Sequence, residues 1–327
     1  MSIDVHAHAV PAELLDALAA DGSDFGIELT PDRRAVIAGG TPTMAIRHDL
    51  VDFDSRLAAM DRAGIELQVL SSWINLTAYG LDPSKGARWS RRVNESLAAE
   101  AGRIPGRFLA LATAPLQHPE MAAAELRYAT DELGMVGVEI ATTVDGVDLV
   151  SADLDPFWEA AAERASLVLL HPLEPLAGID LKRHFLDNMI GRPAETTIAI
   201  ARLVMAGLFD KYPELRVCVV HGGGFLPYQV GRMQRGWEAI PRLAATDLTT
   251  PPREVINRLY FDTILHNPQA LRYLIDLVGA ERIALGTDYP FEAGDPDPIK
   301  TLDSVPGLTG QEREWIVSKT AKKLIGL

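Results

Sequence analysis

The chain has 327 residues, and 31 lysines and arginines against 45 aspartates and glutamates give it a formal net charge of −14. This acidic balance argues against nucleic acid and anionic membrane as partners, and no apolar run approaches the roughly 20 residues of a membrane span. The single cysteine excludes an intramolecular disulfide and a metal site made of several thiolates. The first residues lack a basic segment followed by an apolar one, so we expect a soluble, cytoplasmic protein.

Short apolar, β-rich runs alternate with longer amphipathic stretches along the chain. Runs that are apolar almost throughout are typical of parallel strands covered on both faces. The predicted strands are 2–8, 66–71, 107–113, 136–141, 167–172, 216–222, 259–263 and 282–288. The predicted helices are 53–64, 84–102, 118–133, 155–165, 195–210, 224–240, 268–279 and 309–325. Eight successive strand–helix units predict an α/β fold, a (β/α)8 TIM barrel, although a doubly wound sheet has the same local pattern.

One segment does not fit this alternation. Residues 20–50 contain a Gly-Gly pair, two prolines and short β-like pieces at 26–29 and 34–38. We interpret them as an insertion after the first strand, a small β element over the barrel mouth. A proline-rich loop at 290–298 follows the last strand. Nothing between 100 and 280 resembles a linker, so we expect a single domain over residues 1–327.

Side chains that can bind metals stand at the ends of several predicted strands. His6 and His8 end the first, His171 the fifth, His221 the sixth and Asp288 the eighth. In a TIM barrel the carboxyl ends of all strands open on one face, where active sites are built. Residues two apart share one face of a strand. We therefore expect the five side chains to converge above the barrel axis, although any one of them alone could be a surface or capping residue.

Nitrogen and oxygen ligands without thiolate suit zinc, manganese, cobalt or iron(II). A catalytic metal site keeps one position for water or substrate, so we expect three or four protein ligands around one divalent ion. The remaining histidine could act as an acid or base beside that position.

Four segments carry a resemblance to a known family: IDVHAHAVP (3–11), LLHP (169–172), the long block 191–232 with its HGGG and VGR motifs, and LGTDYPF (285–291). Together they resemble the amidohydrolase superfamily, and within it the branch of metal-dependent decarboxylases that includes the 2-amino-3-carboxymuconate-6-semialdehyde decarboxylases. The resemblance extends over nearly the whole chain in the same order.

The resemblance implies a role for each residue of the cluster. His6, His8, His171 and Asp288 would hold a single zinc ion, and His221 would serve as acid or base, with Asp288 also part of the catalytic machinery. Decarboxylation would follow when the activated water, or a proton delivered through it, attacks the carbon that bears the carboxylate.

The resemblance also implies a homodimer in which Arg232 reaches a substrate carboxylate in the neighbouring subunit. A guanidinium suits bidentate binding of a carboxylate, although Arg232 could equally be a surface arginine of a helix. The second carboxylate-binding arginine of the family is replaced here by Met44, with Arg47 three residues later. We therefore expect Arg47 and Arg232 to anchor carboxylates of a different, related acid.

Four further residues are weaker candidates. Trp73 and Phe291 lie on predicted mouth loops and could stack on a planar substrate, although either could simply pack in the core. Glu139 ends the fourth strand and Asp262 follows the seventh, where a carboxylate could orient a ligand histidine.

These observations predict a metal-dependent, non-oxidative decarboxylase of a small unsaturated or aromatic carboxylic acid. The same site could instead hydrolyse an amide or lactone, or hydrate a double bond. A third interpretation is a barrel without catalytic activity whose histidines bind metal only structurally, but structural zinc sites are usually closed and rich in cysteine.

Overall fold

The structure is a computed structural model, and it describes residues 1–32, 35–38, 41–42, 45–173 and 179–327. Met44, the residue expected at the altered carboxylate-binding position, lies outside the described residues. The strands are β1 (Ile3–Ala9), β2 (Ile27–Leu29), β3 (Val36–Ala38), β4 (Thr41–Pro42), β5 (Leu67–Ser72), β6 (Phe108–Ala110), β7 (Gly137–Ala141), β8 (Thr143–Val144), β9 (Val147–Asp148), β10 (Leu167–His171), β11 (Arg216–Val219), β12 (Tyr260–Asp262) and β13 (Ile283–Ala284).

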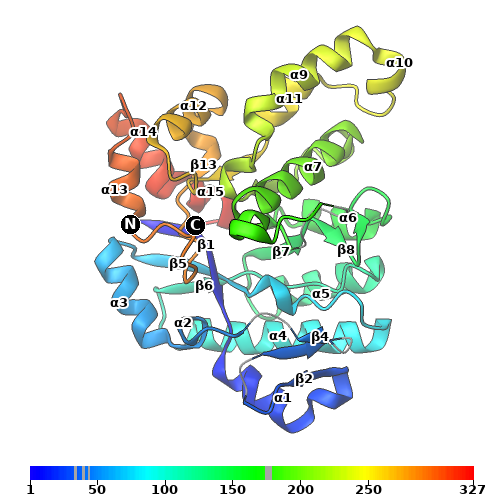
Figure 1. Cartoon of the computed structure of the whole chain (residues 1–327), viewed down its shortest axis with the longest axis vertical. Helices are drawn as coiled ribbons and strands as arrows, with labels where there is room; N and C mark the ends of the chain where they lie inside the picture. Colours follow the sequence, from blue (N-terminus) through cyan, green and yellow to red (C-terminus); the bar gives the residue numbers. More distant parts are fainter. Residues whose placement is uncertain (33–34, 39–40, 43–44, 174–178) are drawn as a thin grey trace.

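Helices lie between most of the strands (Figure 1). The α-helices are α1 (Ala12–Phe25), α2 (His48–Val51), α3 (Phe53–Ala63), α4 (Pro83–Gly102), α5 (Pro119–Asp131), α6 (Asp155–Glu163), α7 (Arg192–Met205), α8 (Leu208–Lys211), α9 (Leu226–Ala239), α10 (Pro241–Ala244), α11 (Pro252–Ile256), α12 (Pro268–Val278), α13 (Pro298–Asp303), α14 (Gly310–Glu314) and α15 (Thr320–Ile325). Short 3₁₀ turns are η1 (Ile74–Leu76), η2 (Arg183–Phe185), η4 (His221–Gly223) and η5 (Ala280–Arg282), and π turns are η3 (Asp187–Gly191) and η6 (Trp315–Lys319). None of the helices in the described part of the chain has the length and apolar character to cross a membrane.

The eight predicted strands are present and pair in parallel, which confirms the α/β fold. They form two sheets with the orders β1-β5-β6 and β13-β12-β11-β10-β7. Hydrogen bonds also join the two sheets to each other. Beside β6, Ala112 pairs in parallel with Val138 of β7, and beside β13, the Val5 amide of β1 donates to the Leu285 carbonyl at 2.9 Å.

Strand β10 shows why the strand sequences are apolar almost throughout. Leu167 and Leu169 pack in a core between the strands, together with Ile3 and Val5 of β1. Val168 and Leu170 point the other way and pack in the larger core between strands and helices. Successive side chains of a strand alternate between its two faces. A strand that is buried on both faces therefore carries apolar residues at nearly every position.

The segment after β1 differs in part from its prediction. Strands β2, β3 and β4 form a separate antiparallel sheet, close to the predicted β pieces. Residues 20–25, however, belong to helix α1, which was not predicted from the sequence. This helix buries Leu14, Leu15 and Leu18, spaced as on one helical face. Figure 1 places α1 and β2 beyond the carboxyl end of β1.

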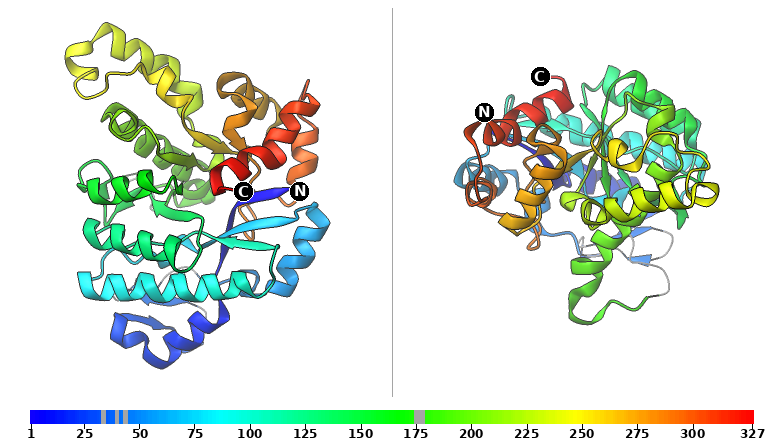
Figure 2. Two further views of the ribbon diagram at one scale, coloured as in Figure 1. Left: turned by 180° about the vertical axis from the view of Figure 1, so that it is seen from behind. Right: turned by 90° about the horizontal axis from the view of Figure 1, so that it is seen from above.

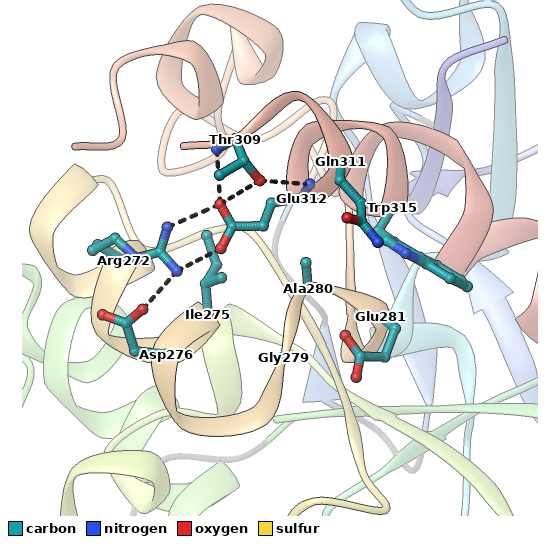
Figure 3. A pocket seen from close by; sticks show the side chains of 10 residues that line it. All are labelled: Arg272, Ile275, Asp276, Gly279, Ala280, Glu281, Thr309, Gln311, Glu312 and Trp315. Atoms are coloured by element: carbon teal, nitrogen blue, oxygen red, sulfur yellow. Dashed lines mark hydrogen bonds and ion pairs between the residues drawn. The ribbon is translucent and has the colours of Figure 1, made fainter. Parts of the chain in front are cut away.

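Helices α12 and α14 are joined by a charged cap. Thr309 accepts the Glu312 amide, and the Glu312 carboxylate accepts the Thr309 amide in return, which is a capping box. Arg272 of α12 donates to both carboxylate oxygens of Glu312, at 2.8 and 3.2 Å (Figure 3). Arg272 first, and then the Thr309 amide, lower the pKa of Glu312 to about 2.

Replacing Glu312 with glutamine should therefore destabilise the protein in a pH-dependent way. Because the carboxyl has a lower pKa in the folded state, its contribution is full above its ordinary value near 4.5 and is lost as the pH falls towards 2. We expect Glu312→Gln to lower the free energy of unfolding by about 2 kcal/mol at pH 7, and by less at pH 3.5, in urea titrations. Glu314→Gln is the control, because Glu314 is 59% exposed and, among the described residues, pairs only with Lys319. A loss for Glu312→Gln that is equal at both pH values would contradict this account.

Candidate metal centre

The structure brings together all five side chains that were expected to converge. His6 and His8 lie on β1, His171 ends β10, His221 follows β11, and Asp288 lies in the loop after β13. The imidazole centroids of His6, His8 and His171 are 4.9 to 5.2 Å apart. The His221 ring lies 5.4 Å from His6 and 5.5 Å from His171. Strands far apart in the sequence therefore build one cluster at their carboxyl ends.

Asp288 occupies the centre of this cluster. Its Oδ1 lies 3.2 Å from His8 Nε2 and 3.5 Å from His6 Nε2. Its Oδ2 lies 3.5 Å from His221 Nε2. The Oδ1 atom is buried and has no hydrogen-bond partner among the described residues. Such an atom is costly unless a cation or a hydrogen bond compensates it.

In three of the four histidine rings, the Nδ1 atom contacts a group other than the five clustered side chains. His6 Nδ1 lies 2.7 Å from the Asp262 carboxylate, and His171 Nδ1 lies 2.8 Å from the Pro172 carbonyl. His8 Nδ1 lies 3.1 Å from Ser71 Oγ, with a Glu139 oxygen at 3.5 Å. Because a proton on Nδ1 leaves the Nε2 lone pair free, each ring can present Nε2 to a metal ion.

Asp262 holds the backbone of the turn at His221 as well as the His6 ring. Its carboxylate also accepts the backbone amides of His221 at 3.0 Å and Gly222 at 2.8 Å. His221 has a φ of +54° and Gly222 a φ of +60°, in the left-handed region that few side chains adopt. A Cβ atom on Gly222 would lie 2.4 Å from the Leu265 side chain, so the glycine lets the backbone make the turn that carries His221.

The electrostatics of the cluster suit a cation. Burial raises the pKa of Asp288, but the nearby His221, His8 and His6 rings hold that pKa well below its usual range. Burial, reinforced by the charges of His8, His6 and His221, lowers the pKa of His171 well below its ordinary value. Burial raises the pKa of Glu139 to about 7, even though His8 and Ser71 act to lower it. A carboxylate and a neutral imidazole are thus both available as ligands.

The donor atoms fit a divalent metal ion. Ligand atoms of His6, His171, His221 and Asp288 lie within 4.8 Å of one another. A second group, which shares His171, consists of His8, Glu139 and His171. Nitrogen and oxygen donors of this kind are typical of sites for zinc and neighbouring metals.

The residues expected to bind substrate lie in different surroundings. The Phe291 ring lies 5.4 Å from the His8 ring, at the edge of the cluster. Arg47 forms ion pairs with Glu292, the neighbour of Phe291, and with Asp49. Trp73 is buried and packs in the larger core. Arg232 is exposed on α9 and pairs with none of the acidic residues that the structure describes.

Several polar residues behind the cluster were not predicted from the sequence. Arg192, in the 191–232 block, donates to the same Pro172 carbonyl that faces His171, at 2.7 Å. Asp4, Arg56 and Thr287 are connected by hydrogen bonds to the backbone or side chains around His6 and His8. The one available signal was Asp4, a charged residue inside an apolar strand, because such residues are rarely buried without a partner.

Comparison with known proteins identifies the class. The amidohydrolase family model matches residues 3–327, so this chain belongs to the amidohydrolase family, as the resemblance predicted. It is 29% identical to 2-amino-3-carboxymuconate-6-semialdehyde decarboxylase of Dictyostelium discoideum, over 100% of this chain and 92% of the relative. It is 32% identical to gamma-resorcylate decarboxylase of Rhizobium radiobacter, over 82% of this chain and 86% of the relative.

Solved structures share the fold. The 5-carboxyvanillate decarboxylase of Sphingomonas paucimobilis superposes with a TM-score of 0.84 at 23% identity, covering 100% of this chain and 99% of the other. A dihydroxybenzoic acid decarboxylase of Polaromonas sp. JS666, solved with manganese and the inhibitor 2-nitroresorcinol, has a TM-score of 0.80 at 26% identity, over 100% and 97% of the two chains. The family and the cluster together support a divalent metal ion in this protein.

Replacing Asp262 with asparagine tests the role of its carboxylate. Because asparagine binds the His6 ring and the two amides less strongly, we expect Asp262→Asn to weaken metal binding about 10- to 100-fold, measured by titrating metal-free protein with Co²⁺ or Mn²⁺. Asp210→Asn is a matched control, since Asp210 also accepts two backbone amides, those of Thr249 and Thr250, but belongs to α8. Equal affinity in the two variants would contradict the role given to Asp262.

Proposed function

We propose that this protein is a metal-dependent, non-oxidative decarboxylase of a small aromatic or unsaturated carboxylic acid. The observation that carries the proposal is the convergence of four imidazoles and the Asp288 carboxylate at the strand ends, where Asp288 Oδ1 has no hydrogen-bond partner among the described residues. The two curated relatives described above are decarboxylases of small carboxylic acids by name, which favours decarboxylation over the other reactions such a site could catalyse.

We further propose that the two parallel sheets form one closed (β/α)8 barrel in a single domain over residues 1–327. The hydrogen bonds that join the sheets beside β6 and β13 support closure, and the match of the family model to residues 3–327 supports a single domain. A cytoplasmic location stays a prediction, supported by the single cysteine, which is buried as a free thiol.

His6, His8, His171 and Asp288 are the proposed ligands, with Glu139 supporting His8. Zinc is our first choice of metal, and manganese, cobalt and iron(II) are the alternatives, manganese being the ion in the Polaromonas structure. When bound, a divalent cation supplies a Lewis acid that polarises a substrate oxygen and stabilises developing negative charge.

His221 and Asp288 are the proposed catalytic residues. In decarboxylation the bond from the substrate carbon to its carboxylate breaks, CO₂ leaves, and a proton takes its place on the carbon. His221 Nε2 lies 3.5 Å from Asp288 Oδ2, so the pair can hold that proton. His221 Nδ1 is buried without a hydrogen-bond partner among the described residues, so this nitrogen is available to bond a polar group of a substrate.

The substrate would lie against Phe291, which can stack on a planar ring. Arg47, which pairs with Glu292 next to Phe291, would anchor a carboxylate by exchanging this ion pair. Trp73, the other candidate for stacking on a planar substrate, is buried in the larger core.

We propose a homodimer in which Arg232 of one subunit contributes to the site of the other. Figures 1 and 2 show α9 and α10 projecting from the rest of the molecule. Large apolar side chains are exposed on these helices, among them Tyr228 at 78% and Leu243 at 71%. Exposed apolar area of this kind is typical of surfaces that bind another protein, and a second copy docked there would bring Arg232 towards a neighbouring site.

Activity should require both the metal and His221. Incubation with dihydroxybenzoates, 5-carboxyvanillate and 2-amino-3-carboxymuconate-6-semialdehyde should release one CO₂ per acid consumed, measured as ¹³CO₂ from carboxyl-labelled substrate. Removal of metal with a chelator should abolish release, and added Zn²⁺ or Mn²⁺ should restore it. His221→Asn should lower kcat about 10²- to 10⁴-fold while keeping the metal content of the parent.

The competing reactions have different products. If esters or lactones are opened, or double bonds hydrated, while none of the acids yields CO₂, the decarboxylase proposal is wrong. His266→Asn is the control for the histidine substitution, because His266 is exposed, donates to the Ala293 carbonyl and belongs to neither group of possible metal ligands.

The proposed role of Arg232 between subunits predicts complementation. Arg232→Ala and His221→Ala chains should each be inactive alone, since each lacks one part of every site. Mixed dimers would contain one intact site, so co-refolding should restore up to about half of the parent activity per mixed dimer. Purified mixed dimers, isolated with two different affinity tags, that show no activity would rule out a contribution of Arg232 across the interface.

A further inference from the structure

A second polar cluster lies directly behind the proposed metal centre. It consists of Asp4 of β1, Gln68 of β5, Arg56 of α3 and Thr287 of the loop before Asp288. Asp4, Arg56 and Gln68 are almost completely inaccessible to solvent. Burying a carboxylate and a guanidinium costs free energy unless both groups are fully bonded. The bonds of Asp4 and Arg56 therefore indicate what this cluster does beside the site.

Strand β1 contains a bulge between Asp4 and Ala7. Asp4 lies opposite Gln68, and His8 lies opposite Ser71. Gln68 and Ser71 are three residues apart on β5, so they point to opposite faces. Asp4 and His8, four apart, would share a face on a regular strand. The extra residue in the bulge therefore turns His6 and His8 towards the metal centre while Asp4 points away from it.

Asp4 stabilises this bulge. Its Oδ1 accepts the His6 backbone amide at 3.0 Å, which the irregular ladder leaves available, and the Thr287 amide at 3.1 Å. Its Oδ2 accepts the Thr287 hydroxyl at 2.6 Å and the Gln68 side-chain amide at 2.8 Å. One carboxylate thus ties the residue before one proposed ligand, Asp288, to the backbone of another, His6.

Arg56 completes the connection from the helix side. Its Nη1 donates to Gln68 Oε1 at 2.9 Å, and its Nη2 donates to the carbonyl of His8. The guanidinium carbon also lies 4.6 Å from the centroid of the Tyr289 ring, the residue after Asp288. The positive charge of Arg56 compensates Asp4 through Gln68, and the same residues hold both ends of the His6–His8 segment.

We propose that Asp4 and Thr287, supported by Gln68 and Arg56, are positioning residues that set the metal affinity of this centre by fixing the β1 bulge relative to the Asp288 loop. This inference rests on the proposed metal centre but does not depend on which reaction the metal serves.

The test compares two isosteric substitutions. Thr287→Val removes the hydroxyl that donates to Asp4 and accepts the Tyr289 amide. Thr320→Val, the matched control, removes a buried hydroxyl that donates at 3.2 Å to the Ala280 carbonyl, which lies before β13 at the other end of the strand. Both variants lose one buried hydroxyl, so we expect similar losses of stability in metal-free protein, measured by urea unfolding.

The metal affinity should differ between Thr287→Val and Thr320→Val. Titration of metal-free protein with Co²⁺, followed by its visible absorption, should show at least a tenfold weaker dissociation constant for Thr287→Val and no change for Thr320→Val. Thr287→Ser keeps the hydroxyl and should retain the affinity of the parent. Asp4→Asn should weaken binding as well, and Thr287→Ala replaces Thr287→Val if valine prevents folding.

The outcomes are distinct. Equal affinities for Thr287→Val and Thr320→Val, at equal loss of stability, would show that the polar cluster only stabilises the fold and would overturn the inference. A parent protein that binds no Co²⁺ would overturn both this inference and the metal centre. A parent that binds Co²⁺ and releases no CO₂ from any acid would overturn the proposed reaction alone, and the affinity series would still decide the role of Asp4 and Thr287.

Discussion

The arrangement of the whole site depends on one buried carboxylate, that of Asp262. It holds the Nδ1 side of His6 and at the same time accepts the amides of His221 and Gly222. A residue at the end of β12 therefore orients a ring on β1 and shapes the turn after β11. Because all three groups share one acceptor, a shift of any of these strands would disturb the other two.

Charge is the second constraint. The chain as a whole is acidic, with a net charge of −14, and the cluster adds buried carboxylates from Asp288 and Glu139 to four imidazoles. Buried charges of one sign are tolerated when a cation or a hydrogen bond compensates them. Asp288 and Glu139 each have an oxygen without a hydrogen-bond partner in the described part of the chain, which favours a divalent ion as the compensating charge. Such an ion would supply the positive charge that an anionic substrate needs inside an otherwise negative molecule.

Much of this could be predicted from the sequence. The eight parallel strands were found because burial on both faces leaves continuous apolar runs, and the five clustered residues because each follows such a run. Helix α1 was missed because Gly22 and Asp21 interrupt its pattern, and Asp21 has non-helical backbone angles there. The bulge in β1 could not be foreseen, since an extra residue in a strand is visible only against its partner. The pairing of Arg47 with Glu292 depends on two loops far apart in the sequence.

The backbone at two of these positions restricts the choice of amino acids. His221 and Asp288 both have positive φ values, +54° and +57°, in a region where histidine, aspartate and asparagine are enriched among residues other than glycine and where β-branched side chains are strongly disfavoured. Histidine and aspartate are also metal-binding and proton-carrying side chains. Backbone geometry and ligand chemistry therefore favour the same few amino acids at these two positions. The backbone conformation alone restricts which residues can replace His221 and Asp288, apart from any requirement of function.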